Sequence, residues 1–302
     1  MAETSMQDLI HGIGSGDIVP YLGAGALSGV VNLETGEPIP ADSDSLILAM
    51  NNGKPMSPRL MYEFPRAAMD IELKRGRSAV NRFLDTLYGN TRWSASPLHA
   101  WLAAIGTHYV IDINRDSQLQ QCYADRPHTL IRGISRIAGT DYRFRIHHYD
   151  GERYSDQEIP QEAVDRSLPI LFKPMGSPLP DATYIASDAD YVDYISELMG
   201  GFAIPGFVKA YRQGKQYLFL GLRMTRDTER MVLSDMIYGA SRPAGWALIP
   251  EPNDKERRFC QRLNIEIIEA DVSDLMAAAA HIPIQTVAAR SLQNGQTVAP
   301  SA

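Results

Sequence analysis

The chain has 302 residues, of which 44% are hydrophobic and 22% are charged, and its formal net charge is −7. These values are typical of a globular protein with a sizeable core, in one large α/β domain or two smaller ones. The negative charge argues against nucleic acid as the main partner, because a phosphate backbone needs a clustered basic surface. No run reaches the roughly 18 apolar residues of a membrane span, so no membrane partner is expected.

The termini and cysteines bear on the cell compartment. Residues 1–13 have neither the basic start nor the long apolar core of a secretory signal. Cys122 and Cys260 lie far apart and in no metal-binding spacing. They fit a reducing compartment, so we expect a cytoplasmic protein without a disulfide framework or a bound metal.

Along the chain, apolar strand-like runs alternate with helical patterns. The expected helices cover residues 5–15, 62–88 with a break near Gly76, 97–105, 191–199 and 254–263. The expected strands cover residues 19–22, 109–113, 143–146, 169–172, 217–222, 247–249 and 265–268. Residues 29–58 are rich in Pro, Gly, Asn and Asp, and we expect a long excursion with one apolar patch at 46–50.

This alternation predicts the fold class. The run at 217–222 is apolar throughout, as in a strand buried on both faces. The sequence therefore predicts an α/β fold, with a doubly wound, mostly parallel, Rossmann-like sheet and a helical insertion. We expect one domain over residues 1–282 with the insertion at 30–95, followed by a disordered tail at 283–302, where Gln, Ser, Ala and Thr dominate.

The most informative segment is Ile18 to Ser28, IVPYLGAGALS, a short strand that runs into Gly23-Ala24-Gly25. Two glycines separated by one alanine let the backbone turn sharply and approach a ligand with no Cβ in the way. A helix that follows would point free N–H groups at a phosphate. The alternative is an ordinary strand-to-helix turn packed tightly for its own sake, since the full GxGxxG spacing is missing.

Polar residues follow three further strands, where open α/β sheets bind their ligands. The first group is Asn114-Arg115-Asp116, which would hold a ribose or orient a water, or would simply form a turn. The second is 173–177, KPMGS, for which a Pro/Gly turn is the competing interpretation. The third is Gly221 with Thr225 and Asp227, which would suit an adenosine or a diphosphate.

In this order, the motifs resemble the sirtuin-like family, in its large zinc-free bacterial branch related to anti-phage NAD hydrolases rather than the histone deacylases. That branch opens with a GAG loop and a small residue, and continues with a proline-hydrophobic-His helix and a strand ending in T-T-N-x-D. The further motifs are K-x-H-G-S, a serine and acidic residue before D-Y, and F-x-G-x-S-x-x-D. The corresponding residues here are Gly23, Ala24, Gly25 and Ser28; Pro97 to His99; Asp112 to Asp116; Lys173 to Ser177; Ser187, Asp188, Asp190 and Tyr191; and Phe219, Gly221, Thr225 and Asp227.

The resemblance covers roughly residues 8 to 275 and implies that NAD lies across the carboxyl ends of the strands. It implies a catalytic Asn114 that positions a water or the nicotinamide ribose, together with Asp116. The family's histidine base is replaced here by Met175. A thioether accepts no proton at neutral pH, and a positioned base is worth about 10²–10⁴ in rate.

Two further departures concern charge and an alternative base. Asp112 replaces a threonine and adds a negative charge near the diphosphate. His147 and His148 are candidates to replace the missing base, although such a pair is also typical of a partly exposed strand end.

Two functions therefore compete. The preferred one is a catalytically impaired protein that binds NAD, ADP-ribose or another adenine nucleotide and acts as a sensor, scaffold or regulatory subunit. The alternative is an active NAD glycohydrolase of a bacterial defence type. A homo-oligomer or a protein partner fits either. The residues expected to bind the cofactor are Gly23, Ala24, Gly25, Ser28, Asn114, Asp116, Gly176, Ser177, Gly221, Thr225 and Asp227.

Overall fold

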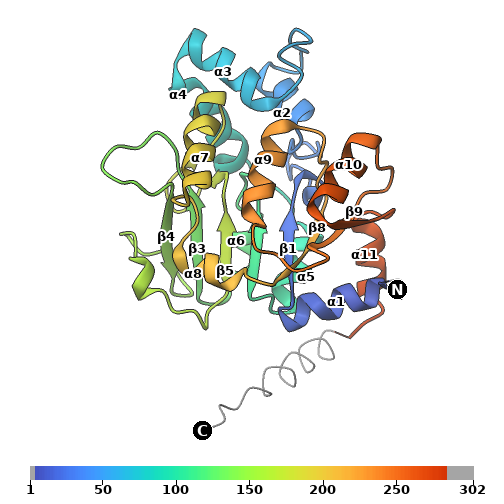
Figure 1. Cartoon of the computed structure of the whole chain (residues 1–302). Coiled ribbons are helices and arrows are strands. Elements are labelled where there is room, and N and C mark those ends of the chain that lie inside the picture. The colour runs from blue at the N-terminus through green and yellow to red at the C-terminus, as the bar shows by residue number, and fades with distance from the viewer. Residues whose placement is uncertain (1–3, 284–302) are drawn as a thin grey trace.

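The computed structural model describes residues 4–283, and an eight-stranded sheet lies at its centre (Figure 1). Of the tail expected at 283–302, residues 284–302 lie outside the described residues. The strands, in their order across the sheet, are β10 (Ile265–Ile268), β9 (Gly245–Leu248), β8 (Gln216–Leu220), β1 (Ile18–Leu22), β2 (Tyr109–Asp112), β5 (Ile170–Lys173), β3 (His128–Gly133) and β4 (Phe144–Tyr149). A separate pair consists of β6 (Gly176–Ser177) and β7 (Thr183–Tyr184).

The direction and order of the strands make β1 the switch point of the sheet. Every pair in the large sheet is parallel except β3 with β4. β1 pairs with β2 on one side and with β8 on the other, so the chain order reverses at β1. The loop after β1 therefore leaves the sheet at its topological switch point, where open α/β sheets bind ligands. The predicted doubly wound, mostly parallel fold is confirmed.

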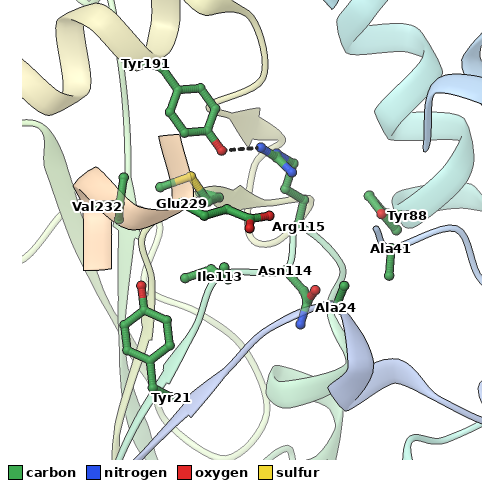
Figure 2. Close-up of a pocket in the computed structure, with 11 residues that line it drawn as sticks. Tyr21, Ala24, Ala41, Tyr88, Ile113, Asn114, Arg115, Tyr191, Glu229 and Val232 are labelled. Carbon is green, nitrogen blue, oxygen red and sulfur yellow. Dashed lines mark hydrogen bonds between the residues drawn. The ribbon is translucent and has the colours of Figure 1, made fainter. Parts of the chain in front are cut away.

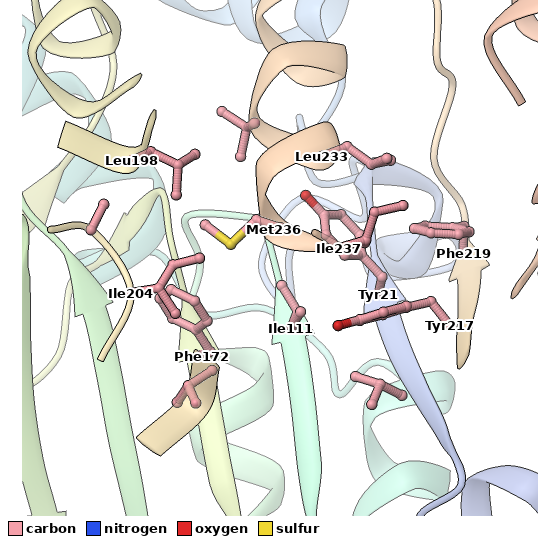
Figure 3. Close-up of a cluster of buried hydrophobic side chains, with 14 of the residues drawn as sticks. Tyr21, Ile111, Phe172, Leu198, Ile204, Tyr217, Phe219, Leu233, Met236 and Ile237 are labelled. Atoms are coloured by element: carbon pink, nitrogen blue, oxygen red, sulfur yellow. The ribbon is translucent and has the colours of Figure 1, made fainter. Parts of the chain in front are cut away.

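Helices cover both faces of the sheet (Figure 1). One face carries α1 (Met6–Ser15), α5 (Pro97–Ala104), α6 (Gln118–Cys122) and α11 (Val272–Ala279). The other carries α7 (Asp188–Gly200), α8 (Gly206–Tyr211), α9 (Asp227–Met236) and α10 (Asp254–Leu263). The strands alternate between the two faces: Tyr21 and Phe219 pack on the α9 side with ring centroids 5.4 Å apart, whereas Leu22 packs against α5 and α11. Figure 3 shows the α9-side cluster, in which Leu233 and Met236 lie over the strands.

The insertion between β1 and α5 forms its own small core at one end of the molecule (Figure 1). It contains α2 (Ser43–Met50), α3 (Phe64–Arg75), α4 (Arg77–Leu84) and a π-helical turn η2 (Asp85–Asn90). The two remaining short helices are η1 (Ala24–Leu27) and η3 (Gln161–Ala163). Gly76, with φ of 81°, separates α3 from α4 and confirms the predicted break.

The structure differs from the expected elements at several points. The apolar patch at 46–50 lies in helix α2, because the Asp42 carboxylate accepts from the backbone N–H groups of Asp44 and Ser45 and caps the helix. Strand β3 was not predicted, and its partner β4 forms an antiparallel edge. Helices α6, α8, α9 and α11 were also not predicted, and α9 contributes directly to the candidate site.

Candidate functional site

The glycines after β1 and β8 pack against each other. A Cβ on Gly23 would lie 2.7 Å from Gly221 O, and one on Gly25 would lie 2.7 Å from Gly221 Cα. Gly25 N–H donates to Gly221 O at 2.8 Å, and Gly221 has a φ of 65°. The glycines are thus needed for the contact between the two loops. Tight packing of a strand-to-helix turn therefore explains the glycines at 23, 25 and 221. The helix that follows the loop is only the short η1, so it does not supply the longer helix start expected at a phosphate.

A groove runs over these loops, and we call it the outer groove. Its volume is about 820 Å³, within the roughly 300–1,000 Å³ of small-molecule sites. It is bordered by the glycine loop, the start of the insertion, and the ends of β8 and β9. Its lining includes Ala24, Gly25, Ser28, Ala41, Gly221, Arg223, Thr225, Arg226 and Glu229.

Three helices begin at the wall of the outer groove. The first residues of α2, α5 and α11 line it, so their positive dipole ends lie at its surface. Asp42, Ser96 and Asp271 already cap these helices with their side chains. Arg223 and Arg226 also line the groove; Arg223 pairs with Glu256 at 2.8 Å and Arg226 with Asp44 at 3.4 Å.

A second, smaller space lies deeper, between β1, β2 and α9, and we call it the inner cavity (Figure 2). Its volume is about 50 Å³. It is lined by Tyr21, Ala24, Ala41, Tyr88, Ile113, Asn114, Arg115, Met175, Tyr191, Glu229 and Val232. Ala24, Ala41 and Glu229 line both spaces, so the inner cavity adjoins the outer groove at these three residues.

Asn114 is held in one orientation at the inner cavity. Its Nδ2 donates to Gly23 O and to Asp112 Oδ1, both at 2.9 Å. Both amide hydrogens are therefore in use, and Oδ1 has no hydrogen bond within residues 4–283. The amide oxygen is the group of Asn114 left to accept a bond from a ligand or water.

Under Asn114 lies a buried ion pair. Lys173 Nζ lies 2.6 Å from Asp112 Oδ2, His99 Nε2 lies 3.4 Å from the same oxygen, and all three side chains are fully buried. Burial alone would raise the pKa of Asp112, but the Lys173 ammonium and His99 outweigh it and hold that pKa well below its usual value. The negative charge expected near the diphosphate is thus offset by Lys173, which fixes the orientation of Asn114 through Asp112.

Met175 contributes a buried thioether to the wall of the inner cavity, where it is 3% exposed. Arg115 lines the same cavity; its Nε donates to Ile185 O at 2.7 Å. Its Nη2 donates to Tyr191 OH at 3.0 Å (Figure 2). The two alternative bases, His147 and His148, both lie on the edge strand β4 and line neither space.

The structure adds one ionisable group that sequence reasoning missed. Glu229, on the first turn of α9, points into the inner cavity (Figure 2). Burial raises the pKa of Glu229 to about 7, aided by the nearby Glu63 carboxylate and opposed by Arg226 and Arg115. Its carboxyl has no hydrogen bond or ion pair to any residue that the structure describes. The helical spacing of Val232, Leu233 and Met236 is the signal that would have predicted α9.

The other predicted site residues divide into two groups. Gly25, Ser28, Gly221 and Thr225 line the outer groove, and Ala24 lines both spaces. The remaining ones, which line neither space, are Gly23, Asp116, Gly176, Ser177 and Asp227.

These five residues have local structural roles. The Asp116 carboxylate accepts from Gln118 N–H at 2.7 Å. Gly176, at a φ of 84°, pairs with Tyr184. Ser177 is fully buried, and Asp227 pairs with Arg230. Gly23 contacts a residue of the inner cavity, because its carbonyl accepts from the Asn114 amide at 2.9 Å.

Comparison with known protein families shows the family to which the chain belongs. The sequence model of the SIR2-like domain family matches residues 108–268, more than half of the chain. The chain therefore belongs to the SIR2-like domain family. The matched region includes β2, β5 and α9, and so contains Asn114, Met175 and Glu229. No curated protein matches the sequence.

Two other findings concern metal sites and membrane-spanning helices. Over residues 4–283, no three His, Cys, Asp or Glu side chains lie together as a metal site would require. In the same range, no helix is long and apolar enough to cross a membrane.

Proposed function

We propose that this SIR2-like protein binds NAD or a related adenine nucleotide such as ADP-ribose, with the diphosphate over Gly23 to Gly25. The observation that supports this most is the outer groove, which lies at the switch point beside β1 and has the volume of a small-molecule site. The groove also carries Arg223 and Arg226 on its wall, although both are paired with carboxylates, so the support for the nucleotide comes from the place and size of the groove rather than from its charge. Asn114, whose amide oxygen accepts no hydrogen bond within residues 4–283, lines the inner cavity that adjoins this groove.

We further propose that NAD hydrolysis is impaired. Met175 gives the inner cavity an apolar wall, at the position that the resemblance assigns to the family's histidine base. The inner cavity, at about 50 Å³, is far below the roughly 300 Å³ at which small-molecule pockets begin. A nicotinamide ring would therefore have to displace side chains to enter. The protein would then act as a sensor, scaffold or regulatory subunit. A cytoplasmic location and assembly with itself or a partner are parts of this proposal that rest on the sequence.

The alternative function, an active NAD glycohydrolase of a bacterial defence type, is favoured by one observation. Glu229 supplies an ionisable group to the cavity that also contains Asn114, and its pKa of about 7 suits a base at neutral pH. The two functions make opposite predictions for nicotinamide release.

Calorimetry tests the binding proposal. NAD and ADP-ribose are titrated into the wild type, Ser28→Trp and Ser78→Trp. Both serines are exposed, but only Ser28 lines the outer groove. We expect wild type and Ser78→Trp to bind alike and Ser28→Trp to bind at least tenfold more weakly. Absence of binding to the wild type, or equal binding by all three proteins, would contradict the proposed site.

A further inference from the structure

Glu229 carries an unsatisfied carboxyl at the point where the outer groove meets the inner cavity. Its partly buried side chain lines both spaces together with Ala24 and Ala41. Within residues 4–283 the carboxyl accepts no hydrogen bond and joins no ion pair. The carboxyl oxygens of this partly buried side chain are therefore left to accept hydrogen bonds from a ligand in the groove.

The surroundings of Glu229 keep it available. The Arg115 guanidinium is already bonded to Ile185 O and Tyr191 OH. Arg226 pairs with Asp44, and its guanidinium lies 5.5 Å from the centre of the Tyr62 ring. Neither arginine therefore forms an ion pair with the carboxyl.

Carboxylates on neighbouring elements also face Glu229. Glu63, just before α3, accepts from the N–H and hydroxyl of Thr228. These bonds hold the Glu63 carboxyl beside the first turn of α9, next to Glu229. Asp42, the cap of α2, adds a weaker repulsion. Tyr21 and Tyr191, from β1 and α7, contribute phenols to the same cavity. These groups leave Glu229 with like charges nearby and no direct partner.

We propose that Glu229 binds the cis-diol of the ribose that lies beyond the diphosphate of an ADP-ribosyl ligand. This inference rests on the proposed nucleotide binding. Ala24, Gly25 and Glu229 all line the outer groove, so a sugar attached to a diphosphate at the glycine loop would meet Glu229 without entering the inner cavity. An ionised carboxylate only accepts hydrogen bonds, so it can take one from each hydroxyl of a diol.

The proposal has a consequence for pH. The ionised form of Glu229 accepts from both hydroxyls, so binding should release a proton whenever the free protein holds one. With a pKa of about 7 in the free protein, ADP-ribose affinity should rise about tenfold between pH 6 and pH 8. The diphosphate diester of ADP-ribose does not titrate in this range, so the protein supplies the proton.

Calorimetry with two ligands and three proteins tests this inference. ADP-ribose is compared with the β-methyl ester of ADP, which keeps the diester charge but has no second ribose. Each is titrated at pH 6 and pH 8, in two buffers of different ionisation enthalpy, into the wild type, Glu229→Gln and the control Glu162→Gln. Glu162 is exposed on η3, away from both spaces. Urea unfolding confirms that each variant is folded.

We expect the tenfold rise and the proton release for ADP-ribose with the wild type and Glu162→Gln. Glu229→Gln should abolish both, and the methyl ester should show neither with any protein. If ADP-ribose binds the wild type without pH dependence, or if Glu229→Gln keeps that dependence, the inference is wrong while nucleotide binding stands. If neither ligand binds the wild type, both proposals are wrong. Glu229→Asp, which keeps the charge, should retain the pH dependence at reduced affinity.

Discussion

Lys173 Nζ lies 2.6 Å from Asp112 Oδ2, and both side chains are fully buried beneath Asn114. Asp112 also accepts from the backbone N–H and side-chain amide of Asn114. The ion pair thus connects the ends of β2 and β5 and orients the one amide that both competing functions need. Its loss would affect stability and the site together.

Lys173→Met should destabilise the protein by about 3–5 kcal/mol at pH 7, because it leaves the Asp112 carboxylate buried without its cation. The pKa of Asp112 is lowered in the folded state, so this contribution is present above its ordinary value of 3.8 and is lost as the pH falls further. The cost of the substitution should therefore shrink in acid. Urea unfolding at pH 7 and pH 3 measures it.

The control is Lys74→Met, which removes a Lys74–Asp70 pair of similar length, 2.7 Å, on the surface. Exposed pairs contribute at most about 1 kcal/mol, so this variant should stay close to the wild type. Equal effects of the two substitutions would show that the buried pair does not stabilise the site as we describe.

Gly221→Ala should cost about 3 kcal/mol of folding free energy. The new Cβ would collide with the backbone of Gly25 and Ala26, at a φ of 65° that L-residues rarely adopt. Gly214→Ala is the matched control, since Gly214 has a φ of 71° but nothing within 4 Å of an added Cβ. It should cost only about 1 kcal/mol. Similar losses at both positions would contradict the packing role of Gly221.

Glu229→Gln should stabilise the folded protein at pH 8 but not at pH 4.5. The pKa of Glu229 rises from 4.5 to about 7 on folding. Between these two pH values the folded state binds more protons than the unfolded state, so the wild type loses stability as the pH rises. By pH 8 the free energy of unfolding of Glu229→Gln should exceed that of the wild type by about 3 kcal/mol. Urea unfolding across this range measures it, with Glu162→Gln expected to follow the wild type. A flat difference would mean that the carboxyl titrates normally.

The sequence predicts much of the sheet, because its central strands are apolar runs followed by glycine or polar turns. Strand β3 escaped prediction because it begins with His128 and contains Arg132, both fully buried. Arg132 is tolerated there because it pairs with Asp181, 49 residues away. No local pattern reveals such a partner.

The candidate site was predicted only in part for the same reason. Asn114 and Met175 follow strands, and their place at the sheet edge follows from the fold class. Glu229 lies on α9, and this helix packs against β1 and β2, which are far from it in the sequence. Its place at the site therefore depends on tertiary packing, which no local pattern reveals. The charge of Asp112 was recognised, but its neutralisation by Lys173, 61 residues later, depends on the pairing of β2 with β5.

The proton NMR spectrum of NAD incubated with the protein tests the central claim, nucleotide binding without hydrolysis, most directly. We predict that the adenine and ribose resonances broaden while free nicotinamide stays absent, or forms at least about 10²-fold more slowly than a typical turnover of 10 s⁻¹. Sharp adenine resonances at high protein concentration would contradict binding. Rapid growth of the nicotinamide signal, abolished by Asn114→Ala, would contradict the impairment and identify the protein as an active glycohydrolase.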